Sequence, residues 1–209
     1  MTLRASIVQL SSVRMTPMAL KMRAEREARW GEAVARKNFP DYEWQRLSFI
    51  GRRLKGSPSL LEVGPGRGFL SRMIAKGGRY PRQEVVDITP APRSIKAKYG
   101  PGVVFRQESV TQLADADGAF DTVLCMEVLE HLEDGDFETA LAQVRRVCAR
   151  RLIITLPFAQ PLPLPDYHKQ RFDADRLERL FPDGRFTLLF KEPVTRWPWV
   201  MIEERRAAG

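Results

Sequence analysis

A glycine-rich loop follows a short apolar segment of the chain. Residues 60–68 read Leu-Leu-Glu-Val-Gly-Pro-Gly-Arg-Gly, so three glycines alternate just after an acid. Glycine reaches backbone angles that are closed to other residues and lets a ligand approach the main chain. A dinucleotide site would require G-x-G-x-x-G, but Phe69 occupies the place of the third glycine. Glu62 can orient an ammonium group instead, whereas the alternative is a tight turn that binds nothing. The candidate contacts are Glu62, Gly64, Pro65, Gly66 and Gly68.

Two further stretches could bind the nucleoside part of a ligand. Asp87 ends the second predicted strand, 19 residues after the last glycine of the loop, and Ile88 follows it. A carboxylate at this place can accept hydrogen bonds from both hydroxyls of a ribose, although an N-cap or a surface acid would look the same. After the third predicted strand, Glu108, Ser109 and Val110 could bind the edge and face of an adenine, or they form an ordinary polar loop.

A polar turn follows the fourth predicted strand. It begins at Met126 and continues as Glu-Val-Leu-Glu-His-Leu over residues 127–132. With this turn, the run from Leu60 to Phe158 resembles the class I methyltransferases that act on small molecules, including the ubiquinone-biosynthesis type. The resemblance rests on three ordered motifs, which are Glu62–Gly68, Asp87 and Glu127–Leu132.

The resemblance implies S-adenosyl-L-methionine as the methyl donor and S-adenosyl-L-homocysteine as the product. It implies that Gly64, Gly66 and Gly68 flank the methionine moiety and that Asp87 holds the ribose. Residues 108–110 would then contact the adenine. Met126 and Glu127 would lie on the sulfonium side.

Two looser matches extend the resemblance. Arg46 precedes the glycine loop at a place where an arginine can meet the cofactor carboxylate in these families, and a solvated helix arginine is the alternative. His168 lies in the stretch His-Lys-Gln-Arg-Phe, which resembles the substrate-pocket segment ahead of the last helix. If the acceptor is a hydroxyl or an ammonium, a base must take its proton. His168 is our first candidate for that base, followed by His131, which could also be structural, and Glu127.

Several other chemistries lack support. The motif D/N-P-P-Y/F of exocyclic amine methylation is missing, and Cys125 has no preceding proline, as cysteine-dependent base methylation would require. No G-x-S-x-G motif indicates a serine hydrolase. The two histidines and two cysteines show no metal-ligand spacing, so we expect no metal site. Cys125 and Cys148 form no C-x-x-C pair, and we expect them to be reduced in a cytoplasmic protein.

The elements around these residues predict an α/β fold. The predicted fold is a Rossmann-like, doubly wound, seven-stranded sheet that is mostly parallel, with an antiparallel C-terminal strand and N-terminal helices. The helices are expected over residues 15–38, Tyr42–Leu54, 69–76, Ala91–Tyr99, Asp136–Cys148 and Asp173–Phe181. The strands are expected over Ser59–Val63, Glu84–Ile88, Val103–Arg106, Phe120–Met126, Arg151–Leu156, Phe186–Lys191 and Trp199–Glu203.

Charge divides the chain into two predicted parts. Residues 1–57 form a basic helical cap with 12 Lys/Arg against 5 Asp/Glu, out of a net charge of +8, and residues 58–209 form the methyltransferase domain. A basic segment can bind nucleic acid or contact an anionic membrane peripherally. We favour a solvated helix face over either partner. No apolar run is long enough to span a bilayer.

These observations leave three functions open. The favoured one is methyl transfer from S-adenosylmethionine to an O, N or C atom of a small molecule or lipid precursor. The second is an RNA or protein methyltransferase that docks its substrate through the basic segment. The third is a cofactor-binding module without catalysis.

Overall fold

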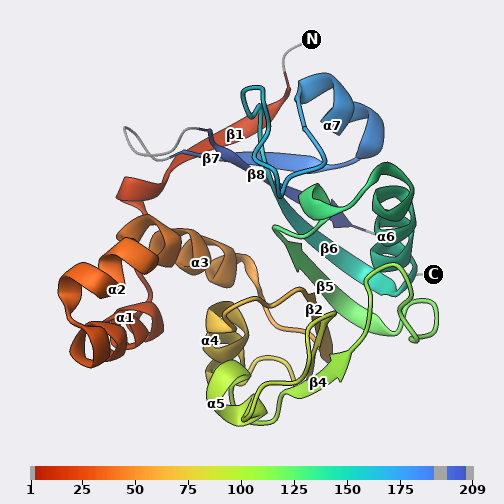
Figure 1. Cartoon of the computed structure of the whole chain (residues 1–209). Coiled ribbons are helices and arrows are strands. Elements are labelled where there is room, and N and C mark those ends of the chain that lie inside the picture. Colours follow the sequence, from red (N-terminus) through yellow and green to blue (C-terminus); the bar gives the residue numbers. More distant parts are fainter. Residues whose placement is uncertain (1–2, 191–196, 206–209) are drawn as a thin grey trace.

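The computed structural model describes residues 3–190 and 197–205. Its centre is one eight-stranded sheet in the order β1-β7-β8-β6-β5-β2-β3-β4 (Figure 1). All neighbouring strands run parallel except β8, which is antiparallel to both β6 and β7. The strands are β1 (Ala5–Gln9), β2 (Ser59–Val63), β3 (Arg82–Asp87), β4 (Val104–Gln107), β5 (Phe120–Met126), β6 (Cys148–Pro157), β7 (Arg185–Phe190) and β8 (Trp199–Arg205).

The helices pack on both faces of this sheet. Those N-terminal to the glycine loop are α1 (Pro17–Trp30), α2 (Glu32–Asn38) and α3 (Asp41–Arg53); the later ones are α4 (Phe69–Gly77), α5 (Ile95–Tyr99), α6 (Asp134–Arg146) and α7 (Ala174–Leu180). One apolar cluster joins α1, α3 and α4 to one face, where Trp44 and Ile50 are fully buried. The other joins α6 and α7 to the opposite face through Phe137 and Leu177. The N-terminal helices therefore share a core with the sheet.

The predicted α/β class and mixed sheet are confirmed, but the number of strands was wrong. The eighth strand is β1, which pairs in parallel with the edge strand β7 from Ala5–Phe186 to Gln9–Phe190. We had expected only helices in the basic N-terminal segment. Five residues on a sheet edge, with the side chain of Ile7 67% exposed, show neither the apolar alternation nor the turn residues that mark a strand.

Several boundaries also differ from expectation, and the helix expected over Ala91–Tyr99, for example, begins only at Ile95. The helix expected over residues 15–38 is interrupted at Gly31, whose φ of 77° ends α1 before α2 begins. Cys148 starts β6 rather than ending a helix, and both cysteines are free and buried. The strand expected at Phe186–Lys191 is described from Arg185 to Phe190, and Lys191 lies outside the described residues.

Strand register brings the proposed site together. Val63 at the end of β2 is paired with Val86 of β3 on one side and with Cys125 of β5 on the other. Because these strands are parallel, the loops that follow them emerge at one edge of the sheet, where ligands bind in such folds. Among the described residues, no helix is long and apolar enough to cross a lipid bilayer.

Candidate active site

The glycine loop between β2 and α4 is shaped by close backbone contacts. Gly64, Gly66 and Gly68 have φ values of 63°, 51° and 71°. A Cβ atom on Gly64 would lie 2.4 Å from Val128 Cγ2, and one on Gly68 would lie 2.6 Å from the carbonyl oxygen of Lys98. At Gly66 such an atom would meet nothing within 4 Å. Two of the glycines are thus required by packing, whereas the third leaves open space for a ligand.

A cavity of about 480 Å³ lies against this loop. Its wall opposite the loop comes from the end of α2 and the first half of α3. The predicted residues that line it are Arg46, Glu62, Gly64, Pro65, Gly66, Met126 and Glu127. The lining residues that were not predicted are Lys37, Asn38, Phe39, Pro40, Tyr42, Glu43, Leu47, Arg67, Phe69 and Leu70. The cluster of aromatic residues around Pro40 was the available signal for this wall.

Glu62 is the buried acid of the cavity. It is 3% exposed and accepts a hydrogen bond from Ser71 Oγ at 2.5 Å. Burial raises the pKa of its carboxyl to about 7, and the Ser71 hydrogen bond only partly opposes this shift. A cationic ligand group would favour the ionised carboxylate.

Arg46 bridges Glu43 and Glu127 on the side of the cavity opposite Glu62. Its Nη2 and Nε donate to Glu43 Oε2 at 2.8 and 3.1 Å, and its Nη1 lies 3.3 Å from Glu127 Oε1. The guanidinium also stacks on the Trp199 ring, 4.7 Å from its centroid. Nη1 is buried and makes no hydrogen bond. Besides its ion pair with Glu127, this atom carries N–H groups that can donate to an acceptor in the cavity.

Glu127 is held in a rare backbone conformation at the end of β5. Its φ is 52°, a value uncommon for a residue with a side chain. The backbone N–H donates to the Thr155 carbonyl at 3.0 Å, and Thr155 Oγ1 donates to Glu127 Oε1 at 2.8 Å. Burial raises the pKa of this carboxyl, while the charge of Arg46 opposes the shift. Such local strain is typical of functional sites.

His131, the last residue of the 3-10 helix η2 (Leu129–His131), lies next to His168, and neither residue lines the cavity. Their ring centroids are 5.1 Å apart, in an edge-to-face arrangement. Burial, and then the nearby His131, lower the pKa of His168. The carboxyl of Glu130 is 1% exposed, and burial together with the charge of Glu127 holds its pKa well above the usual range. The structure thus brings together both predicted histidines and an acid that was not predicted.

The predicted nucleoside residues lie at the open edge of the sheet. Asp87 Oδ1 accepts hydrogen bonds from the backbone N–H and Oγ1 of Thr89, both at 2.9 Å. Ile88 is 73% exposed. Asp87 is adjacent to the glycine loop, because Gly64 N–H donates to the Val86 carbonyl at 2.9 Å.

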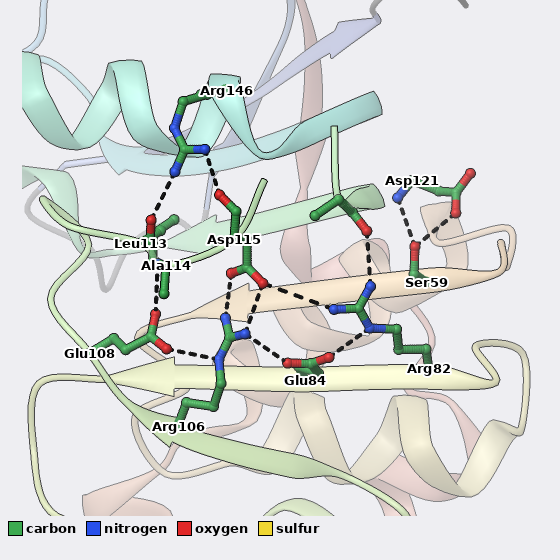
Figure 2. Close-up of polar contacts among 11 residues, drawn as sticks. Ser59, Arg82, Glu84, Arg106, Glu108, Leu113, Ala114, Asp115, Asp121 and Arg146 are labelled. Carbon is green, nitrogen blue, oxygen red and sulfur yellow. Dashed lines mark hydrogen bonds and ion pairs between the residues drawn. The ribbon is translucent and has the colours of Figure 1, made fainter. Parts of the chain in front are cut away.

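The loop after β4 is fixed by charged side chains, as Figure 2 shows. Arg106 contacts Glu84 at 3.2 Å, Glu108 at 3.1 Å and Asp115 at 2.5 Å. Arg146 donates to the carbonyls of Leu113 and Asp115. Glu108 therefore shapes the loop.

The two predicted neighbours of Glu108 also make contacts within the protein. Ser109 Oγ lies 2.7 Å from Thr111 Oγ1, and Val110 is buried in the core. The adenine contacts of residues 108–110 stay a prediction.

The family profile described as a methyltransferase domain matches residues 60–151. The ubiquinone biosynthesis O-methyltransferase of Hahella chejuensis is 35% identical over 130 residues, which cover 58% of this chain and 51% of that protein. The enzyme of the same name from Xanthomonas euvesicatoria is 38% identical over 97 residues, covering 43% of this chain and 39% of the relative.

Residues 60–151 are thus similar to a methyltransferase domain, in line with the resemblance to the class I S-adenosylmethionine-dependent methyltransferases.

Solved structures share the fold of this chain. The 1,6-didemethyltoxoflavin-N1-methyltransferase of Burkholderia thailandensis, with its substrate and S-adenosylhomocysteine bound, superposes with a TM-score of 0.61 at 19% identity over 90% of this chain and 88% of the other. The magnesium protoporphyrin IX methyltransferase of Synechocystis, with S-adenosylmethionine bound, superposes with a TM-score of 0.61 at 18% identity, covering 92% of this chain and 98% of the other. The chain spans only 51% and 39% of the length of these two ubiquinone relatives, so the substrate needs a separate argument.

Proposed function

We propose that this protein transfers a methyl group from S-adenosylmethionine to a small-molecule acceptor. The observation that carries the proposal is the cavity of about 480 Å³ between the glycine loop and the wall formed by α2 and α3. It combines open backbone at Gly66, a buried acid and a buried arginine atom without a hydrogen-bond acceptor. The relatives in ubiquinone biosynthesis support a small acceptor, such as a lipid precursor.

The cavity residues suit the amino-acid end of S-adenosylmethionine. The ammonium group would pair with Glu62, and the carboxylate would meet Arg46 Nη1, which makes no hydrogen bond within the protein. Gly64, Pro65, Gly66 and Gly68 would lie along the methionine chain. At the nucleoside end, Asp87 and Ile88 would hold the ribose, and Glu108, Ser109 and Val110 would contact the adenine. Met126 and Glu127 would lie on the sulfonium side.

S-adenosylmethionine supplies a methyl group that is already activated for in-line displacement. The protein has to align the acceptor with that carbon and exclude water. For a hydroxyl or ammonium acceptor, a proton must also be removed. The predicted groups for this step are His168, His131 and Glu127, and of these Glu127 is the one in the cavity lining.

Ligand binding can be tested by thermal unfolding. Saturating S-adenosylhomocysteine binds only the folded state, so at about one hundred times its Kd it should stabilise by about 2.7 kcal/mol and raise Tm by about 5–10 °C. Asp87→Ala should remove most of this rise, because the ribose loses its acceptor. Asp183→Ala, which changes an exposed aspartate outside the cavity, is the matched control. An unchanged Tm with millimolar ligand would contradict the proposal.

Catalysis needs a second measurement. Transfer of isotope-labelled methyl to any acceptor would exclude a module that only binds the cofactor. RNA binding that depends steeply on salt would support the macromolecular alternative. Within the basic segment 1–57, some cationic side chains already form ion pairs inside the protein: Arg23 pairs with Glu27 at 3.0 Å and Arg36 with Glu32 at 2.8 Å. A nucleic-acid or peripheral membrane partner for this segment and a cytoplasmic location stay predictions.

A further inference from the structure

Two histidines and a buried carboxylate converge beside the proposed active site. Glu130 and His131 come from η2, and His168 comes from the segment between β6 and α7. One ligand-type atom from each of the three residues lies within 4.8 Å of the other two. Within this group, His131 Nε2 is 3.9 Å from Glu130 Oε1. The three side chains therefore face a common point, although 37 positions separate the two histidines in the sequence.

One oxygen of the Glu130 carboxylate lacks a hydrogen-bond partner. Glu130 is 1% exposed, and its Oε2 is buried without a hydrogen bond. The neighbouring backbone does not satisfy this oxygen, because Lys169 N–H and Gln170 N–H both donate to the carbonyl oxygen of Glu130, at 2.7 and 3.1 Å. Leaving a buried polar atom unpaired costs about 1–3 kcal/mol, so such an atom in a native fold calls for a partner.

Both imidazoles are oriented through the same ring nitrogen. His131 Nδ1 lies 2.7 Å from the Tyr167 carbonyl oxygen, and His168 Nδ1 lies 2.8 Å from Gln160 Oε1. A carbonyl oxygen only accepts hydrogen bonds, so Nδ1 of each ring carries the proton and donates. Each Nε2 atom is then left with a free lone pair. This is how proteins orient imidazoles that bind metal ions.

We propose that Glu130, His131 and His168 form a binding site for a divalent transition-metal ion. Two imidazole nitrogens and one carboxylate oxygen suit Zn²⁺, Co²⁺ or Mn²⁺ better than Mg²⁺ or Ca²⁺, which prefer oxygen ligands. The ion would satisfy the orphaned carboxylate oxygen and use both free lone pairs.

Ion binding requires only a small movement of these groups. Ligand atoms about 2.1 Å from a tetrahedral ion are about 3.4 Å apart, so the present spacing, within 4.8 Å, must contract by up to about 1.4 Å. Rotation of His131, whose side chain is 43% exposed, can supply much of this contraction. Three protein ligands leave at least one coordination position open to water or another ligand.

Histidine coordination also bears on the proton transfer discussed above. An imidazole whose Nε2 binds a metal ion cannot take a proton there. Metal binding and a base role at His131 or His168 are therefore competing functions of the same atoms. A direct measurement of ion binding separates them and does not depend on methyl transfer.

The test uses the untagged full-length protein after treatment with a chelator. Co²⁺ titration should give visible d–d absorption at one ion per chain, and calorimetry with Zn²⁺ and Mn²⁺ should give the same stoichiometry. His131→Ala and His168→Ala should each weaken binding by at least about tenfold. Glu130→Gln should do likewise. Glu133→Gln is the matched control, because this exposed glutamate lies three positions from Glu130, outside the cluster.

The metal-binding test can still be decided if one of the variants does not fold. Circular dichroism reports whether each variant is folded, and if buried Glu130→Gln is not, the two histidine variants decide. Retention of the Co²⁺ spectrum and affinity in a His131→Ala, His168→Ala double variant would overturn the proposal. So would wild-type binding no tighter than that of this double variant. Cofactor binding in a protein that fails this test would leave the proposed methyltransferase function intact.

Discussion

The two ends of the proposed cofactor site differ in enclosure and in charge. At the methionine end, Glu62 is 3% exposed and Arg46 is 8% exposed, and both line a cavity beneath α2 and α3. At the nucleoside end, Asp87 is half-buried and the adjacent Ile88 is 73% exposed. The methionine end is assembled from segments that precede the glycine loop in the sequence and from segments that follow it. The nucleoside end uses residues that directly follow neighbouring strands.

The two ends of the site therefore use charged side chains in different ways. At the methionine end, the buried charges are costly without partners, so they couple ligand recognition to stability. At the nucleoside end, the charged side chains pair with one another and hold a loop, as the largely buried pair of Arg106 and Asp115 does. We therefore expect substitutions at the enclosed end to change both stability and binding. Substitutions at the open end should change mainly binding.

Among these substitutions, replacing Arg46 should have the largest effect on the free energy of unfolding. Arg46→Met leaves Glu43 and Glu127 without their shared cation, and breaking a buried ion pair costs about 3–5 kcal/mol. Urea unfolding should show a loss of about 4 kcal/mol. Binding of S-adenosylhomocysteine, measured by calorimetry on the folded protein, should also weaken. Binding of methylthioadenosine, which lacks the amino-acid end, should not.

The control for this prediction is an arginine in a more exposed ion-pair network. Arg36 has a side chain 45% exposed and pairs with Glu27 and Glu32. Because exposed ion pairs contribute about 0–1 kcal/mol, Arg36→Met should alter stability by no more than that. Equal losses in the two variants would contradict the distinction between an enclosed and an open charge.

Two glycines of the loop allow the effect of packing on stability to be distinguished from the effect of ligand space on binding. Gly64→Ala adds a methyl group 2.4 Å from Val128 Cγ2 at a φ of 63°, so stability should fall by about 3 kcal/mol. Gly66→Ala meets no atom within 4 Å and should cost only about 1–2 kcal/mol, the cost of its left-handed backbone conformation. Its methyl group would occupy cofactor space. Thermal unfolding with and without S-adenosylhomocysteine distinguishes the two effects, and a normal Tm rise in Gly66→Ala would contradict this placement of the ligand.

The sequence predicted the parts of the site that follow directly from strand order. Glu62–Gly68, Asp87 and Met126 each follow or end a strand, so parallel register alone places them at one edge. Arg46 was matched only loosely by resemblance, yet it lines the cavity. Phe39 and Tyr42 were missed, because the turn at Pro40 that directs them toward the loop depends on the packing of α2 and α3.

His131 and His168 were both predicted near the acceptor, but their grouping with Glu130 was missed for a related reason. Metal-ligand motifs are recognised when ligands are close in sequence or repeat at helical spacing. Here the third ligand comes from a distant segment, and Lys169 N–H holds that segment on the Glu130 carbonyl at 2.7 Å. Strand β1 was missed for a similar reason, since only pairing with β7 makes it a strand. Such tertiary contacts have no local pattern.

The smallest predicted effect concerns the pH dependence of cofactor binding at Glu62. Burial raises its pKa to about 7, so the carboxyl is largely protonated at pH 6. Because the ligand ammonium needs the ionised carboxylate, affinity should fall as pH decreases through 7. Between pH 7.5 and pH 6 the ionised fraction falls by about eightfold, and the Kd of S-adenosylhomocysteine should rise by the same factor. Calorimetry over this range stays below the pKa of an α-amino group, about 7.7–8.0. Glu62→Gln should bind more weakly at pH 7.5 and with a flat profile, whereas a flat profile in the unmodified protein would show that the enclosed acid does not bind the ammonium.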